Sequence, residues 1–222
     1  MTTVPCLLWD VDGTLVDTTE LISASLDHVY QKYYGRTLPD AERRALIGTP
    51  LSKQVRVFGP LEDFGIAEAD ILGDFIDYYE AHRASERILH DVIAILIEGR
   101  RRGLPTGLVT SKNREELANT LPRLGIADYV DFAVTADDIP NPKPAPDGIL
   151  LALDHFAIPA GLRPNAFYIG DTVHDMYAAN AAVVRGIGVT WGAALAESLA
   201  ATNPYAICTT PDSLRSLLFR TS

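Results

Sequence analysis

Short apolar runs alternate with longer amphipathic segments over most of the chain. Runs rich in β-branched and aromatic residues predict strands, and apolar residues recurring every three or four positions predict helices. This alternation is typical of βα units around a parallel sheet that is buried on both faces. The predicted strands are residues 6–9, 106–109, 132–134, 166–169, 186–189 and 205–207. The predicted helices that accompany them are residues 91–102, 114–124, 146–156, 174–182 and 213–219.

One long interval, between the first two predicted strands, shows helical periodicity but no strand pattern. It is far longer than the roughly dozen residues that a crossover connection needs. Helices are predicted within it at residues 19–34, 41–46 and 68–83. We therefore expect an α/β fold in which a Rossmann-like parallel sheet core, residues 1–16 and 88–222, carries an inserted helical cap, residues 17–87.

Composition and charge limit the function classes. The 222 residues are 47% hydrophobic and 22% charged, as in an ordinary globular protein. Nineteen Lys and Arg against 29 Asp and Glu give a net charge of -10, which repels polyanions, so nucleic acid is not an expected partner. Cys6 and Cys208 each lie in an apolar run, which predicts buried thiols in a reducing compartment and a cytoplasmic protein. No apolar run approaches the roughly 20 residues of a membrane helix, so no membrane partner is expected.

The first predicted strand ends in two acids, Asp10 and Asp12, followed by Gly13 and Thr14. Ligands of open α/β sheets bind at the carboxyl ends of the strands. Alternation along an extended backbone sends both carboxylates to the same side, so one can attack a substrate while the other moves a proton. An EF-hand calcium loop does not fit, because Leu15 stands where that loop needs glycine. A turn with capping acids remains the alternative.

A second pair of acids, Asp171 and Asp175, follows the strand predicted at 166–169. Their spacing places them on one side of a loop that enters a helix, near the same sheet edge as Asp10 and Asp12. Four gathered carboxylates repel one another strongly, which predicts a bound cation, and an all-oxygen ligand set favours Mg²⁺ over Zn²⁺. Taken alone, Asp171 and Asp175 have an alternative interpretation as a helix N-cap and a first-turn acid.

Two smaller signals lie between these acids. The strand predicted at 106–109 ends in the hydroxyls of Thr110 and Ser111, and Lys143 lies between two prolines ahead of a predicted helix. A hydroxyl and an ammonium are what a phosphate oxygen and an aspartyl nucleophile need beside them. Each residue taken separately is more often structural or solvent-exposed.

The ordered set of motifs resembles the haloacid dehalogenase superfamily over nearly the whole chain. The set comprises DVDGT at residues 10–14, Thr110, KPAPD at 143–147, and Gly170-Asp171 with Asp175. Together with GVTWG at 188–192 and the helical interval, it is most similar to the phosphoglycolate phosphatase-like branch.

The resemblance implies a role for each matching residue. Asp10 attacks phosphorus to form an aspartyl-phosphate, and Asp12 protonates the leaving oxygen and then activates water. Thr110 binds a phosphate oxygen, and Lys143 neutralises charge on Asp10. Mg²⁺ is held by Asp10, the backbone carbonyl of Asp12 and Asp171, with Asp175 a ligand either directly or through water.

We also expect the substrate, a small phosphorylated metabolite, to meet residues from both parts of the chain. Small residues at 48–50 permit a ligand to approach closely, so this cap loop is expected to face the catalytic acids. Lys53, Arg56 and Arg83 are candidate anion contacts, each more often solvent-exposed. The expected substrate-binding residues are Thr14, Gly48, Thr49, Ser111 and Lys112.

Three departures from the family pattern stand out. Trp9 occupies a position where Phe is common, and Ser111 replaces a common Asn. Residues 86–90 replace a Pro-Gly turn at the return from cap to core, so the hinge there is not specified by the resemblance.

The resemblance implies a Mg²⁺-dependent phosphatase, a monomer or a homodimer. A phosphosugar mutase of the same family is one alternative, since it keeps the acid at Asp12, whereas the dehalogenase branch lacks that acid. A receiver domain of a signalling relay is the other, because it groups acids, a hydroxyl and a lysine in the same way; receivers are about half this length and have no cap.

Overall fold

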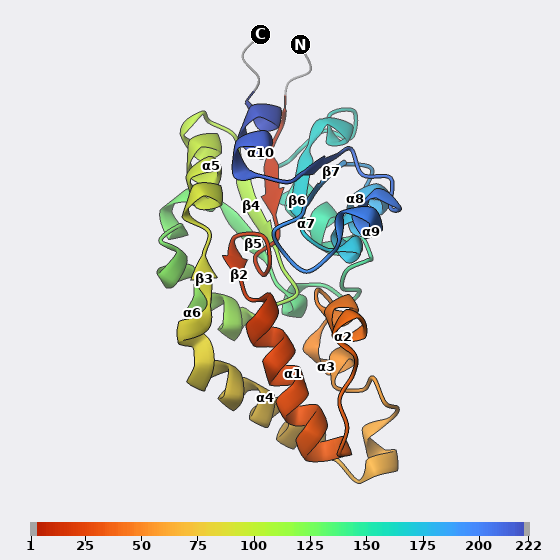
Figure 1. The fold of residues 1–222 in the computed structure, drawn as a ribbon. Coiled ribbons are helices and arrows are strands. Elements are labelled where there is room, and N and C mark those ends of the chain that lie inside the picture. The colour runs from red at the N-terminus through yellow and green to blue at the C-terminus, as the bar shows by residue number, and fades with distance from the viewer. Residues whose placement is uncertain (1–3, 220–222) are drawn as a thin grey trace.

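A six-stranded parallel sheet forms the centre of the larger lobe (Figure 1). The computed structural model describes residues 4–219. The strands lie in the order β5-β4-β1-β6-β7-β8, which confirms the predicted parallel α/β fold. Each differs from its predicted range by at most one residue at either end. The strands are β1 (Leu7–Trp9), β4 (Thr106–Val109), β5 (Phe132–Val134), β6 (Phe167–Gly170), β7 (Arg185–Val189) and β8 (Ala206–Cys208).

Helices cover both faces of this sheet, as the uninterrupted apolar strands predict. Successive residues of β1 point to opposite faces, so Leu7 and Trp9 pack in one hydrophobic cluster and Leu8 in the other. All three side chains are fully buried. The sheet-bearing lobe contains the helices α5 (His90–Arg101), α6 (Arg114–Leu124), α7 (Asp147–His155), α8 (Val173–Ala181), α9 (Ala196–Ala200) and α10 (Pro211–Leu218).

The second lobe is helical and has a hydrophobic cluster of its own. Leu26, Tyr30, Val55, Ile71 and Phe75 are buried in this cluster, which includes no residue of the sheet. The lobe lies beyond the carboxyl edge of the sheet, in the lower half of Figure 1. Its helices are α1 (Thr19–Tyr34), α2 (Asp40–Leu46), α3 (Leu51–Gln54) and α4 (Glu68–His82). We refer to this lobe as the cap.

A two-stranded antiparallel ribbon joins the cap to the sheet-bearing lobe. It consists of β2 (Val16–Asp17) and β3 (Arg87–Ile88), with Val16 opposite Ile88. The expectation of an interval without strands is therefore wrong at its two ends. Two-residue strands are too short to produce a readable alternation of apolar and polar positions. The expected cap boundaries, 16/17 and 87/88, fall inside this ribbon.

Several short elements were not predicted because a single turn leaves no hydrophobic period. Helices α3 and α9 are among them. The others are the 3₁₀ segments η1 (Leu61–Phe64), η2 (Arg83–Ser85), η3 (Ala127–Tyr129), η4 (Ala136–Asp138) and η5 (Arg163–Asn165).

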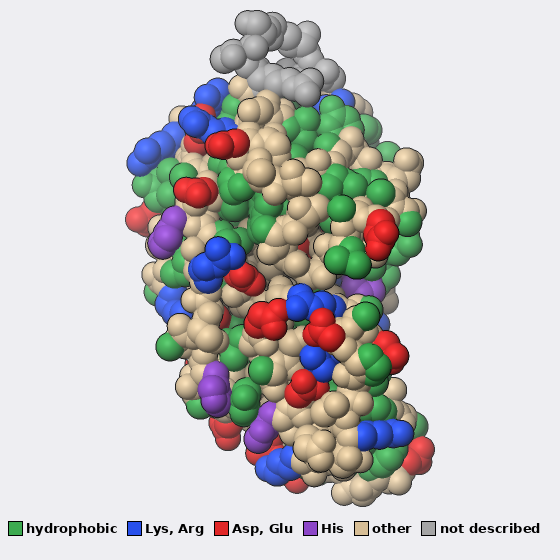
Figure 2. Space-filling model, viewed as in Figure 1, with side chains coloured by type: hydrophobic (Ala, Val, Ile, Leu, Met, Phe, Trp, Pro, Cys, Tyr) green, Lys and Arg blue, Asp and Glu red, His purple; other side chains and the backbone are tan. Residues whose placement is uncertain are grey.

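Cys6 and Cys208 are buried and unpaired, as expected. Within residues 4–219, no helix is both long and apolar enough to cross a membrane. On the face drawn in Figure 2, acidic and basic side chains are interspersed along the junction between the two lobes.

Candidate active site

The carboxyl ends of β1 and β6 bring the first and the last acidic motif together. These strands pair in parallel, with Trp9 opposite Ile169, and the backbone N–H of Asp10 donates to the carbonyl of Ile169 at 2.8 Å. One carboxylate oxygen from each of Asp10, Asp171 and Asp175 lies within 4.8 Å of the others. Asp10 and two acids that follow it by 161 and 165 positions therefore form one buried acid cluster.

Lys143 is the counter-charge of this cluster. Its Nζ lies 2.9 Å from Asp10 Oδ1 and 2.7 Å from Asp175 Oδ1, and it donates to the Tyr168 hydroxyl at 3.2 Å. Only 3% of the residue is exposed. The two carboxylates raise the pKa of Lys143 in opposition to burial, so the ammonium stays charged.

Asp175 is held by a helix start and by a tyrosine. It is the third residue of α8, where it forms a capping box with Thr172: Oδ2 accepts from the Thr172 N–H at 2.9 Å and from its hydroxyl at 2.6 Å. Its Oδ1 accepts from the Tyr168 hydroxyl at 2.8 Å as well as from Lys143. These donors lower the pKa of Asp175 below its usual range despite complete burial.

Asp171 is enclosed by two loops. Its Oδ1 accepts from the Thr14 hydroxyl at 3.1 Å, and its Oδ2 from the Ala193 N–H at 2.7 Å. Gly13 has φ +72°, and a Cβ there would stand 2.1 Å from Asp171 Oδ2. Any side chain at residue 13 would therefore displace Asp171, which explains why the DVDGT motif needs a glycine at this position.

The cluster is electrostatically frustrated when it contains protein groups alone. Burial, with Asp175 nearby, raises the pKa of Asp171 to about 7. The pKa of Asp10 is also well above its usual range, because burial and Asp175 outweigh Lys143. Three carboxylates against one ammonium leave an excess of negative charge in a buried place.

This donor set fits a divalent cation. Three buried carboxylates offer hard oxygen ligands within reach of one ion, and the raised pKa values of Asp10 and Asp171 show that positive charge is lacking there. Asp175 already accepts four hydrogen bonds, so Asp10 and Asp171 have the more available oxygens.

Asp12 lies outside this cluster and faces the cap. Its Oδ2 pairs with Lys112 Nζ at 3.0 Å, and its Oδ1 is buried without a hydrogen-bond donor among the described residues. Lys112 Nζ also lies 5.6 Å from the centre of the Tyr79 ring of α4. The pKa of Lys112 is raised, because the attraction of nearby acids, chiefly Asp12, outweighs the opposite effect of burial. Strict alternation does not extend beyond the end of β1 at Trp9, so Asp10 lies in the acid cluster while the Asp12 carboxylate lies outside it, on the cap side.

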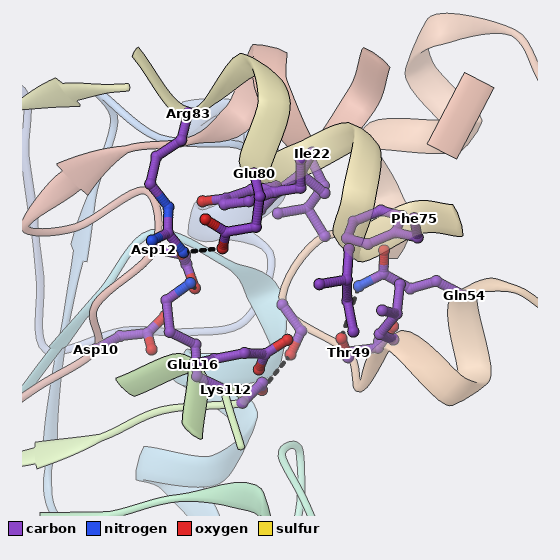
Figure 3. A pocket seen from close by; sticks show the side chains of 16 residues that line it. Asp10, Asp12, Ile22, Thr49, Gln54, Phe75, Glu80, Arg83, Lys112 and Glu116 are labelled. Atoms are coloured by element: carbon purple, nitrogen blue, oxygen red, sulfur yellow. Dashed lines mark hydrogen bonds and ion pairs between the residues drawn. The ribbon is translucent and has the colours of Figure 1, made fainter. Parts of the chain in front are cut away.

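A cavity between the two lobes connects Asp10 and Asp12 with the cap (Figure 3). Its volume is about 90 Å³. The cap loop expected to face the acids does line it, through Gly48 and Thr49, together with Ser111 and Lys112 from the loop after β4. Gly48 has φ +93°, and its carbonyl accepts from the Ser111 hydroxyl at 2.8 Å, so cap and sheet lobe touch here.

Two of the expected substrate-contacting and phosphate-binding residues lie outside the lining of this cavity. Thr14 is fully buried and its hydroxyl is used on Asp171. Thr110 is 3% exposed, and its Oγ1 accepts from the Lys112 N–H at 3.2 Å. Both residues therefore position neighbours of the cavity: Thr14 fixes Asp171, and Thr110 fixes the loop that presents Lys112.

The three candidate anion contacts of the cap differ in where they lie relative to the cavity. Arg83 lines the cavity and pairs with Glu80. Arg56 pairs with Glu68 away from it, and Lys53 is exposed on α3, also outside the lining. Tyr168, Gln54 and Glu80 were not predicted from the sequence. The local pattern of a strand or helix does not show which of its polar side chains point into a site.

The fold and the site together define a class of protein. A parallel α/β sheet with buried acids and a lysine at its carboxyl edge, under a helical cap, is the arrangement of a capped phosphoryl-transfer hydrolase. Residues 7–189 match the haloacid dehalogenase-like hydrolase family, and the chain belongs to this family.

Relatives agree with that assignment. The chain is 32% identical over 207 residues to pyrophosphatase PpaX of Bacillus velezensis, covering 90% of each chain. It is 30% identical over 219 residues to phosphoglycolate phosphatase 1 of Pseudomonas aeruginosa, covering 96% of this chain and 78% of the relative. A solved hydrolase from Pseudomonas syringae shares the fold, with a TM-score of 0.82 at 22% identity and coverage of 96% and 97%. The enzyme class expected from the sequence, a phosphoric monoester hydrolase of the haloacid dehalogenase type, is confirmed by the family match and by these relatives.

Proposed function

We propose that the protein is a Mg²⁺-dependent phosphatase that hydrolyses a small phosphomonoester through an aspartyl-phosphate. The observation that carries the proposal is the Asp10–Lys143–Asp175 chain beside Asp171, in which Asp10 lines the cavity between the lobes. It combines a nucleophile, a fixed positive charge and a place for a metal within one buried cluster. The phosphatase and pyrophosphatase relatives support the same reaction class.

In the first step, an oxygen of Asp10 attacks phosphorus and the bond from phosphorus to the leaving oxygen breaks. Asp12, in its protonated form, gives its proton to that leaving oxygen. Lys143 is 2.9 Å from Asp10 Oδ1 and stabilises the negative charge that accumulates beside it. Asp12 is suited to the proton transfer because it faces the cavity, where the leaving group has room.

In the second step, Asp12 takes a proton from water, and the resulting hydroxide oxygen bonds to phosphorus. The bond from phosphorus to Asp10 breaks, which releases phosphate and restores both carboxyl groups. Asp175 holds Lys143 throughout, and Thr14 holds Asp171.

Asp10 and Asp171 would hold Mg²⁺, together with the backbone carbonyl of Asp12 and with Asp175 directly or through water. When bound, the ion supplies charge neutralisation for the attacking carboxylate and the phosphoryl oxygens. The hard oxygen ligands favour Mg²⁺, and Ca²⁺, with its larger radius and higher coordination number, is expected not to support turnover.

The test is phosphate release from a panel of phosphoesters with Mg²⁺, combined with detection of the covalent intermediate. Mass spectrometry of acid-quenched enzyme should show one phosphoryl group on the peptide that contains Asp10, removable by hydroxylamine. Turnover without that adduct in rapid-quench samples would contradict the covalent route. A phosphosugar mutase would transfer the group to another sugar oxygen and release little phosphate.

The two buried, unpaired thiols support a reducing compartment, so we propose that the enzyme acts in the cytoplasm. Burial raises the pKa of the Cys6 thiol to about 12, which disfavours its thiolate form.

A further inference from the structure

The cavity between the lobes has an apolar wall on the cap side. This wall combines aliphatic side chains and one aromatic ring from α1, α3, α4 and the loop before α3. Its members are Ile22, Ile47, Leu51, Phe75 and Ile76. Burial of a ligand's apolar surface against this wall is favourable. The wall provides no hydrogen-bond donor and no positive charge for an anionic group.

The charged residues of the lining leave no positive charge in excess. Lys112 is paired with Asp12 at 3.0 Å, and Arg83 is paired with Glu80. Besides Asp10, the lining contains three acids and two cations. The acids are Asp12, Glu80 and Glu116, and the cations are Lys112 and Arg83. A second anionic group on the substrate would have to break one of these pairs or remain unpaired in a low-dielectric space.

Two polar atoms at this cavity lack partners among the described residues. Gln54 is 6% exposed, and its Nε2 donates to the Thr49 carbonyl at 2.7 Å, which leaves its Oε1 buried without a donor. Arg83 Nε is buried without an acceptor. Figure 3 shows Gln54 and Arg83 on opposite sides of the pocket. A buried acceptor and a buried donor left unsatisfied are costly unless a ligand completes them.

We propose that the leaving group of the substrate is an uncharged, hydroxylated alcohol with an apolar face, and that Gln54 is a specificity-determining residue that accepts a hydrogen bond from one of its hydroxyls. The inference rests on the proposed phosphatase function. A hydroxyl can donate to Gln54 Oε1, and a hydroxyl oxygen can accept from Arg83 Nε. An ionised carboxylate or a fully ionised second phosphate cannot donate to Gln54 and would face Glu80 and Glu116.

The experiment compares matched phosphoesters at saturating Mg²⁺. The pair 2-hydroxyethyl phosphate and phosphoglycolate differs only in a hydroxymethyl group against a carboxylate, and pyrophosphate provides a second anionic leaving group. We expect kcat/KM for 2-hydroxyethyl phosphate to exceed that for both anionic substrates at least about tenfold. Equal or greater kcat/KM for phosphoglycolate or pyrophosphate would overturn the inference.

Gln54→Leu tests the named residue against a substrate that lacks the hydroxyl. It should lower kcat/KM for 2-hydroxyethyl phosphate about three- to tenfold and leave that for ethyl phosphate nearly unchanged. Equal losses on the two esters would show a general disturbance of the loop at Thr49 and would remove Gln54 from specificity. Lys53→Ala, on the same helix but outside the cavity lining, is the matched control and should change neither value.

Glu80→Gln provides an independent variant on another helix. Removing this acid frees Arg83, so activity toward phosphoglycolate should rise relative to 2-hydroxyethyl phosphate by at least about threefold. An unchanged ratio would contradict the charge argument. p-Nitrophenyl phosphate separates the two levels of inference: no phosphate release from it or from any panel member refutes the phosphatase function itself, whereas release with an anionic preference refutes only the substrate class.

Discussion

The acid cluster and the cap-side cavity differ in how completely their polar atoms are satisfied. In the cluster, Asp175 accepts four hydrogen bonds, and Lys143 contacts two carboxylates and a tyrosine. In the cavity, Gln54 Oε1, Arg83 Nε and Asp12 Oδ1 are buried without partners among the described residues. The hydrogen bonds of Asp175 and Lys143 are thus completed within the protein, whereas the cavity retains buried polar atoms that a ligand could satisfy.

This difference corresponds to the two lobes. The cluster is built on sheet strands and a capped helix, which hold side chains rigidly, whereas most of the cavity wall is contributed by a lobe attached through a short ribbon. The arrangement favours hinge motion of the cap over a fixed chemical centre. We therefore expect substitutions in the cluster to change rate and metal affinity, and substitutions in the cap to change substrate choice.

The largest effect is expected from Asp10→Asn. The variant loses the nucleophile, so turnover should fall at least roughly a thousandfold on every substrate. Lys143 keeps its contact with Asp175, so the fold should persist, which circular dichroism and thermal unfolding can verify. Near-native turnover by purified Asp10→Asn would end the assignment of the nucleophile.

The division between the two ends of the site predicts unequal metal binding in two other variants. Asp12→Asn should slow turnover about a hundredfold or more, because proton transfer is lost, but should leave Mg²⁺ affinity nearly intact. Asp171→Asn should weaken Mg²⁺ affinity directly. Isothermal titration with Mg²⁺ measures both without relying on activity. A loss of affinity in Asp12→Asn as severe as in Asp171→Asn would contradict the separation.

Stability should depend on pH through Asp171. Its pKa of about 7 in the folded protein lies above the ordinary value of 3.8, so the stability from its protonated form is present below about pH 4 and is lost as pH rises through 7. His174 acts with the opposite sign, since burial lowers its pKa and stability is lost as pH falls. The His174 contribution is the same in the wild type and in Asp171→Asn, so it cancels in the difference between their stabilities.

Without metal, the Tm of the wild type should therefore fall relative to that of Asp171→Asn by several degrees between pH 5 and pH 7.5. Differential scanning calorimetry in the presence of a chelator measures this difference. A Tm difference that stays constant with pH would show that Asp171 ionises normally.

The sequence alone predicted most of the fold and the acid cluster. Strong apolar runs located all six strands of the sheet, and acids directly after β1 and β6 were expected at one edge because parallel strands share their carboxyl ends. The ion pair between Asp10 and Lys143 is visible only in the structure, since 133 positions separate the two residues. The sequence did predict that the acids need a nearby positive charge.

The remaining contacts depend on side-chain direction and on the packing of distant segments. Tyr168 reads as one more apolar residue of a buried strand, although its hydroxyl donates to Asp175. The hinge at residues 86–90 was unspecified, and in the structure Glu86 accepts from Tyr79 of the cap and pairs with Arg123 of α6. The local sequence around Glu86 contains no pattern that predicts either of these contacts.

The smallest effect, and the most selective one, is expected from Thr49→Trp in the cap loop. Thr49 lines the cavity, and its backbone carbonyl accepts from Gln54 Nε2, so an indole at this position reduces the space for the leaving group while the backbone contact persists. We expect KM to rise several-fold for bulky phosphoesters and less for small ones, with Tm nearly unchanged, because Thr49 is only partly buried. Steady-state kinetics across the substrate panel, with Lys53→Ala as the control, measures the change in ranking. If Thr49→Trp leaves the whole ranking unchanged, the cap loop does not take part in substrate selection, and the contrast between a chemical lobe and a selecting lobe fails.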